Sequence, residues 1–207
     1  MNQNDIETEK TGASRWLLLV LAAILVGAVT FVAYRQVNGR RNSVIASING
    51  QEITLNQFKD EAELSRLKRE LANRPESPVN RPELMNRMIG DVLLLQAAEN
   101  AGVQVKDTAV QAEIDAILNR LSLTREEMAR QLEQHDLGWA VFEGSVRDYL
   151  VLSKFVDDSL LADVAPGERK QHLDSWMLEQ YRSADMTFDQ GFLDSINSDA
   201  ASVSTNG

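Results

Sequence analysis

The chain contains no cysteine and only two histidines among its 207 residues. Without cysteine it cannot form a disulfide, use a thiol nucleophile, build a zinc ribbon or carry a lipid on a cysteine. His135 and His172 lie far apart, each beside carboxylates in polar sequence, so we expect two solvated surface histidines rather than a metal or acid–base pair. The sequence therefore predicts no metal site.

Positive charge is also scarce, because 21 lysines and arginines face 31 aspartates and glutamates, for a net charge of −10. A nucleic-acid-binding protein needs a basic patch, so nucleic acid is not an expected partner. The chain has no H-E-x-x-H, G-x-S-x-G or phosphate-loop motif, each of which would place a metal, a nucleophile or a phosphate. We predict no catalytic residue, no cofactor and no small-molecule substrate, and thus a protein that is not an enzyme.

One long stretch without charge runs from Trp16 to Tyr34. It is close to the roughly 20 apolar residues that cross the hydrocarbon core of a bilayer. Trp16 and Tyr34 lie at its two ends, where aromatic side chains favour the membrane interfaces. The run is longer than the 7–15 or so apolar residues of a signal peptide, and no A-x-A cleavage site follows. We predict a polar N-terminal tail at 1–15, a single transmembrane anchor at 16–34 that contacts lipid, and a linker at 35–43.

Basic residues do not orient this span, because they nearly balance on its two sides. Lys10 and Arg15 precede it, whereas Arg35, Arg40 and Arg41 follow it. The positive-inside rule depends on an excess at one end. Charge alone therefore leaves the side of the membrane open.

The rest of the chain is predicted to be mainly α-helical, with a minor β element. Alternating β-branched residues around Asn49-Gly50 predict a hairpin over 44–54, with a type I′ turn that requires positive φ at both central residues. Apolar spacing, together with capping residues that include Thr54, Asp107 and Thr124, then predicts helices at 55–73, 81–103, 107–121, from 125, 139–161 and 168–184. A short strand is expected at 186–188, followed by a disordered polar tail at 189–207. Docking of Phe192, Leu193 and Ile196 in this tail is the alternative that the sequence leaves open.

The helix over 81–103 is the most apolar of these, and we expect the other helices to pack around it. Its 92–98 half is apolar nearly all round, which predicts core. Its 84–89 half is rich in methionine, a flexible side chain that adapts to varied apolar partners. Core packing is the simpler interpretation of these methionines, and sequence alone leaves both open. The candidate apolar surface for binding a client protein is Leu84, Met85, Met88, Met128 and Phe142.

Several segments, taken in order, carry a family resemblance. These are V-I-A-S-I-N-G-Q-E-I-T at 44–54, L-L-L-Q-A-A-E-N-A-G-V at 93–103, L-T-R-E-E-M at 123–128 and V-R-D-Y-L-V-L-S-K-F at 146–155. Together they resemble the SurA-type N-terminal chaperone domain over 44–188. The resemblance implies a multi-helix domain that lies in the periplasm or elsewhere outside the cytoplasm and holds unfolded or maturing envelope polypeptides. It also implies an N-terminus in the cytoplasm and an anchor in the inner membrane.

Members of that family commonly carry a parvulin-type prolyl isomerase domain between the long helix and the terminal helix. Only residues 157–167 separate the two helices here, so we expect no isomerase activity. The resemblance further suggests that 186–188 pairs with 44–48 and closes the domain. An alternative function is that of an accessory or assembly subunit dedicated to one membrane-complex partner.

Overall fold

The computed structural model describes residues 43–74 and 79–204. The compact unit begins at Val44. The predicted tail at 1–15, the anchor at 16–34 with Trp16 and Tyr34, and the linker at 35–43 except for its last residue lie outside the described residues. Within the described ranges, no helix is both long enough and apolar enough to span a bilayer.

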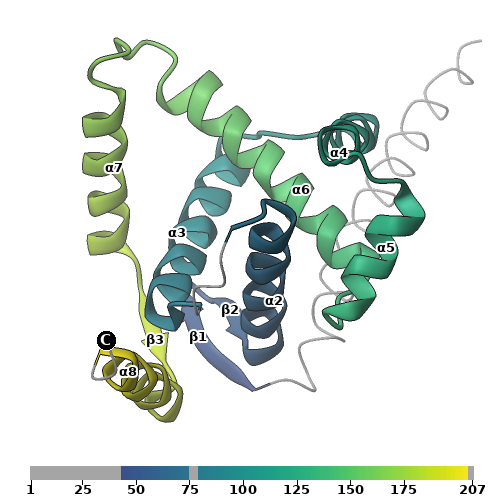
Figure 1. Cartoon of the computed structure of the whole chain (residues 1–207). Helices are drawn as coiled ribbons and strands as arrows, with labels where there is room; N and C mark the ends of the chain where they lie inside the picture. The colour runs from purple at the N-terminus through teal and green to yellow at the C-terminus, as the bar shows by residue number, and fades with distance from the viewer. Residues whose placement is uncertain (1–42, 75–78, 205–207) are drawn as a thin grey trace, which may run out of the picture. The chain divides into compact units, whose positions relative to one another are not determined.

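The described chain is mainly helical and includes one small sheet, as predicted (Figure 1). The strands are β1 (Val44–Ile48), β2 (Gln51–Thr54) and β3 (Met186–Phe188). The helices are α2 (Leu55–Leu71), α3 (Arg81–Asn100), α4 (Asp107–Leu121), α5 (Arg125–Gln134), α6 (Trp139–Phe155), α7 (Arg169–Ser183) and α8 (Gln190–Ser204), with a π-helical turn η1 (Val156–Leu160) directly after α6.

Local chemistry explains several of these boundaries. Asn49 and Gly50 have φ values of 51° and 81° between β1 and β2, which confirms the predicted turn. Thr54 begins α2 with a capping box, because its hydroxyl accepts from the Gln57 backbone N–H at 3.3 Å and its own N–H donates to the Gln57 side chain at 2.8 Å. Thr124 and Glu127 repeat this arrangement at α5.

Two helix predictions need correction. Asp107 was expected to cap α4, but it is the first helical residue and its carboxylate binds Arg147 of α6 at 2.8 Å instead. The helix that begins at Trp139 was expected to stay regular to 161, but it changes to π-helical geometry at Val156.

The sheet joins segments from both ends of the described chain. Its order is β2-β1-β3, and β1 is antiparallel to both neighbours. Ala46 faces Phe188 and Ile48 faces Met186, which confirms the predicted pairing of 186–188 with 44–48. Beyond β1, the Asn49 side chain accepts from the Asp185 backbone N–H at 2.8 Å.

The predicted disordered tail at 189–207 is wrong over most of its length, because α8 occupies Gln190–Ser204. Phe192 and Ile196 are 8% and 3% exposed. The Phe192 ring meets the Phe58 ring of α2 edge-on, with 5.0 Å between centroids. One turn of spacing places both buried side chains on the same face of α8, and their burial stabilises a helix whose sequence is otherwise small and polar.

Buried apolar side chains form two clusters. The first joins the sheet, α2, α3 and α8 and includes Ile48, Phe58, Leu84, Met85 and Leu93. The second joins α2, α4, α5 and α6 and includes Leu64, Leu67, Ile114, Met128, Leu132 and Phe142. Helix α2 contributes to both clusters, so it connects the sheet half of the domain to the α4–α6 half.

Candidate functional site

An apolar pocket of about 320 Å³ opens within the second cluster, between α2, α4, α5 and α6. Aliphatic and aromatic side chains make up most of its wall. Tyr149 is 59% exposed and Lys68 is also exposed, so the pocket reaches solvent beside them. The lining residues are Leu64, Leu67, Lys68, Leu71, Ala72, Ile117, Leu121, Met128, Phe142, Ser145, Val146 and Tyr149.

The pocket wall on the α5 and α6 side is fixed by local interactions. The Thr124 capping box begins α5, so Met128 lies in its first turns and points into the cluster. Two hydrogen bonds from Thr124, first from its backbone and then from its hydroxyl, lower the pKa of Glu127. Trp139 meets Phe142 edge-on at 5.4 Å, and the Arg125 guanidinium lies 5.6 Å from the Trp139 ring centroid. These contacts hold the beginnings of α5 and α6 together.

The residues that line the pocket are suited to binding apolar groups rather than to catalysing a reaction. Ser145 donates its hydroxyl hydrogen to the Phe142 carbonyl at 3.0 Å, so it is not an activated nucleophile. Lys68 is the one charged residue of the lining. Over the part of the chain that the structure describes, no three metal-ligating side chains come together. An engineered apolar cavity of about 150 Å³ holds a benzene molecule, so this pocket has room for one or two large apolar side chains.

A second hollow, of about 520 Å³, lies along α7 and is lined by Ser175, Leu178, Glu179, Arg182 and Ser183 alone. One face of a single helix cannot surround an apolar group, and four of these five lining residues are charged or hydroxylic. The pocket between α2 and α6 is therefore the better candidate site.

The structure divides the five residues that sequence analysis placed on one apolar surface. Met128 and Phe142 line the pocket. Leu84 and Met85 are each 2% exposed in the first cluster, and Met88 packs against that cluster. The proposed division of the 81–103 helix into a core half and a client-facing half is therefore not seen, because residues 84 and 85 are as deeply buried as Leu93.

Sequence analysis did not propose most of the pocket. Leu64, Leu67, Leu71, Ile117 and Tyr149 come from three separate helices. Each belongs to the apolar face of its own helix, and that periodicity is the only signal in the sequence. Periodicity shows which face is apolar, but it does not show which faces leave a space between them.

Near the pocket, a carboxyl group of α3 lies among charges from three helices. Burial is the main cause that raises the pKa of Asp91, and the charges of Glu61 and Asp148 raise it further, whereas Arg87 and Lys68 lower it. Lys68 therefore belongs both to the pocket lining and to the surroundings of Asp91. Its ammonium group and the Arg87 guanidinium both offset the acidic charge around Asp91.

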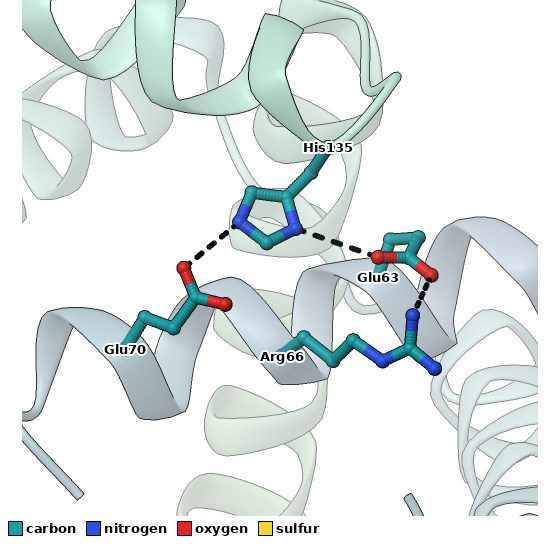
Figure 2. Close-up of polar contacts among 4 residues, drawn as sticks. All are labelled: Glu63, Arg66, Glu70 and His135. Atoms are coloured by element: carbon teal, nitrogen blue, oxygen red, sulfur yellow. Dashed lines mark hydrogen bonds and ion pairs between the residues drawn. The ribbon is translucent and has the colours of Figure 1, made fainter. Parts of the chain in front are cut away.

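His135 follows the last turn of α5 and contacts two carboxylates of α2 (Figure 2). Its Nδ1 lies 3.4 Å from Glu63 Oε2, and its Nε2 lies 3.1 Å from Glu70 Oε2. The side chain is 13% exposed, so the prediction of a solvated histidine is wrong here. The prediction is confirmed for His172, which is exposed on α7.

Comparison with known proteins identifies a matching family model and related chaperones. The model of the family described as SurA-like N-terminal domain matches residues 6–156. A Chaperone SurA from Polaromonas sp. strain JS666 is 26% identical over 149 residues, which cover 69% of this chain and 31% of that protein. A Chaperone SurA from Saccharophagus degradans is 24% identical over 169 residues, covering 81% of this chain and 37% of that protein. The chain thus spans about a third of the length of these curated relatives.

Proposed function

Because the chain belongs to the SurA-like N-terminal domain family, we propose that it is a chaperone-like protein that binds unfolded or maturing polypeptides without ATP or catalysis. The observation that carries the proposal is the solvent-accessible apolar pocket between α2, α4, α5 and α6. An apolar segment of a non-native chain would leave water there, at a gain of about 25 cal/mol per Å² of apolar surface buried.

The proposed mechanism is reversible holding. A client segment inserts one or two apolar side chains beside Met128 and Phe142, while Tyr149 covers them at the rim. Ordering a disordered client costs several kcal/mol, so each site should bind weakly and exchange quickly. The net charge of −10 keeps a protein with an open apolar pocket soluble.

We further propose that residues 16–34 anchor the protein in the inner membrane, with 1–15 in the cytoplasm and the domain that begins at 44 in the periplasm. The apolar run with its terminal Trp16 and Tyr34 supports the anchor. Tethering would keep the pocket where envelope polypeptides emerge. Accessibility of a single cysteine introduced in the linker at 35–43, probed from outside intact cells, tests this orientation.

The connection between η1 and α7 runs only through residues 161–168. This short link supports the proposal that the protein is not a prolyl isomerase. A proline-isomerisation assay with catalytic amounts of the full chain should give the uncatalysed rate.

The function is tested by aggregation of two unrelated unfolded proteins, reduced lysozyme and heated citrate synthase, with the full chain in nanodiscs. We expect both to be protected. Tyr149→Ser should weaken binding about threefold to tenfold, because a well-placed aromatic side chain in an interface commonly contributes more than 1 kcal/mol. Leu178→Ser is the matched control, since Leu178 is 51% exposed on α7, outside the pocket.

Both substitutions are at exposed positions and should leave the melting temperature nearly unchanged. Equal loss in the two variants would contradict the pocket as the binding site. Protection of neither protein, together with copurification of one stable partner from the membrane, would instead favour a dedicated assembly subunit.

A further inference from the structure

We propose that His135 forms a pH-dependent bridge between α5 and α2 that controls access to the apolar pocket. The bridge consists of His135, Glu63 and Glu70 (Figure 2). Only its consequence for client binding rests on the proposed function. The bridge itself depends on the hydrogen-bond donors of the His135 ring and on the charges of the two carboxylates.

The number of donors on the imidazole ring decides the state of the bridge. Both ring nitrogens lie within 3.4 Å of a carboxylate oxygen. A neutral imidazole has one N–H and one lone pair, so it can donate to only one carboxylate and turns its lone pair toward the other. The imidazolium ion carries two N–H groups and donates to both Glu63 and Glu70. The complete bridge therefore requires the protonated ring.

The groups around the ring are mostly acidic. His135 is the C-cap of α5, where the unpaired carbonyls give a partial negative charge that attracts a cation. From α2, the carboxylates of Glu63 and Glu70 face the ring, and the Arg66 guanidinium binds Glu63 at 2.5 Å. Two more carboxylates neighbour it along its own segment. The charged groups around the ring are Glu63, Arg66 and Glu70 of α2, with Glu133 and Asp136 beside it in sequence.

The bridge adjoins the pocket through both of its helices. Leu64, Leu67 and Leu71 of α2 line the pocket, and each directly follows or lies close to a residue of the bridge along that helix. Met128 of α5 lines the opposite wall. At its other end, α5 is held to α4 and α6 through Arg125, which contacts Asp115 and Trp139. A neutral His135 would keep only one of its two hydrogen bonds. The C-terminal end of α5, still anchored by the buried Leu132 and Leu137, would then be held less tightly to α2, and the pocket would widen.

The direction of the pH effect follows from the donor count. The bridge contributes most to stability while the ring is protonated and the glutamates are ionised. Its contribution falls when the ring loses its second N–H, so it decreases as the pH rises. The pocket should thus be narrower near pH 5.5 and more accessible near pH 8.

Hydrogen exchange of the full chain in nanodiscs, corrected for intrinsic rates, tests the bridge without any client. In the wild type, protection of the α5 amides should fall about threefold to tenfold between roughly pH 5.5 and pH 8, the scale of a partly exposed ion pair or two. His135→Gln keeps a hydrogen-bonding group of similar reach but cannot become charged. It should show the lower protection at both pH values.

Two further variants sharpen the test. Glu70→Gln removes one charge but keeps the shape, so the pH response should become smaller. His172→Gln is the matched control, because His172 is the other histidine and is exposed on α7; it should respond as the wild type does. A wild-type α5 whose protection does not depend on pH, or a His135→Gln variant that keeps the full response, would overturn the bridge.

The effect on the pocket is measured separately, with reduced lysozyme as the probe. Its affinity for the wild type should be higher near pH 8, and His135→Gln should bind equally well at both pH values. A pH-dependent α5 with a pH-independent affinity would overturn the control of access. Absence of binding at either pH would contradict the proposed function, while the exchange data would still decide on the bridge.

Discussion

At the residue scale, the carboxyl group of Asp91 illustrates a charge that opposes folding at neutral pH. Burial, assisted by Glu61 and Asp148, raises its pKa above the ordinary value. A carboxyl group whose pKa is higher in the folded state stabilises the fold while it is protonated, and that stability is lost as the pH rises through the folded-state pKa. The ionised Asp91 therefore lowers the free energy of unfolding near pH 7.

Asp91→Asn should raise the melting temperature near pH 7, and the gain should shrink as the pH falls through the range in which Asp91 becomes protonated. Thermal unfolding of the full chain across this range checks the prediction. Asp158→Asn, at an exposed position in η1, provides the control for a change in net charge. An equal gain for both variants would assign the effect to overall charge rather than to burial.

Residue-scale predictions from the sequence were good where the chemistry is local. Asn49-Gly50 and the Thr54 and Thr124 caps depend on neighbours within four positions, and all three are confirmed. The environment of His135 was wrong, because its partners Glu63 and Glu70 belong to a distant helix. Side chains near in space but far in sequence leave no periodic signal.

At the scale of elements, α7 is attached to the domain by few contacts. None of its residues is buried. Its Tyr181 hydroxyl donates to the Asn86 carbonyl of α3 at 2.8 Å, and its Trp176 ring lies 5.8 Å from the Phe155 ring. The backbone of α3 at Gly90 allows this approach, since a Cβ there would lie 3.3 Å from the Tyr181 hydroxyl oxygen and 3.4 Å from Met177 Cε. Glycine at position 90 makes α3 less stable as an isolated helix, but it allows α7 to pack closely against α3.

Substitution of two helical glycines separates these effects. Gly144→Ala in α6 should raise the free energy of unfolding by up to about 1 kcal/mol, because alanine favours the helix and nothing lies within 4 Å of the added Cβ. Gly90→Ala should gain much less or lose stability, since the hydrogen bond to Asn86 limits how far Tyr181 can move. Urea unfolding of both variants measures the difference. An equal gain at the two positions would show that α7 shifts to accommodate the added methyl group without a loss in the free energy of unfolding.

The candidate site shows why elements were easier to predict than their assembly. Met85 and Met128 look alike in sequence, as methionines on apolar helical faces. The first lies in the closed cluster under the sheet, whereas the second lines the pocket. Helix α8 was missed for a related reason, because its small polar sequence predicts disorder and only contact with Phe58 reveals the role of Phe192.

At the scale of the whole molecule, the last described segment completes the first cluster. Helix α8 packs Phe192 and Ile196 against α2 and α3, while β3 pairs with β1. Removal of residues 186–207 should therefore lower the melting temperature markedly or prevent folding. Phe192→Ala alone should cost about 3–5 kcal/mol, the usual range for a buried phenylalanine.

Phe188→Ala is the matched control, because Phe188 in β3 is 39% exposed and its loss should cost far less. Chemical unfolding of the two variants and the truncated chain checks this. A truncated chain that melts at the wild-type temperature would show that β3 and α8 are dispensable for the fold.

The position of β1 between β2 and β3 has a consequence for the order of synthesis. Asn49 and Asp185, joined by a hydrogen bond beside the sheet, are 136 residues apart in sequence. While the ribosome is still making α6, the nascent chain already has its hairpin but leaves one edge of β1 unpaired, and an open edge is a site for pairing with other chains. Such distant strand pairing is slow to form. Until β3 has been synthesised and pairs with β1, the nascent chain is therefore prone to pair with other chains. During this time it would itself resemble an unfolded client of a chaperone.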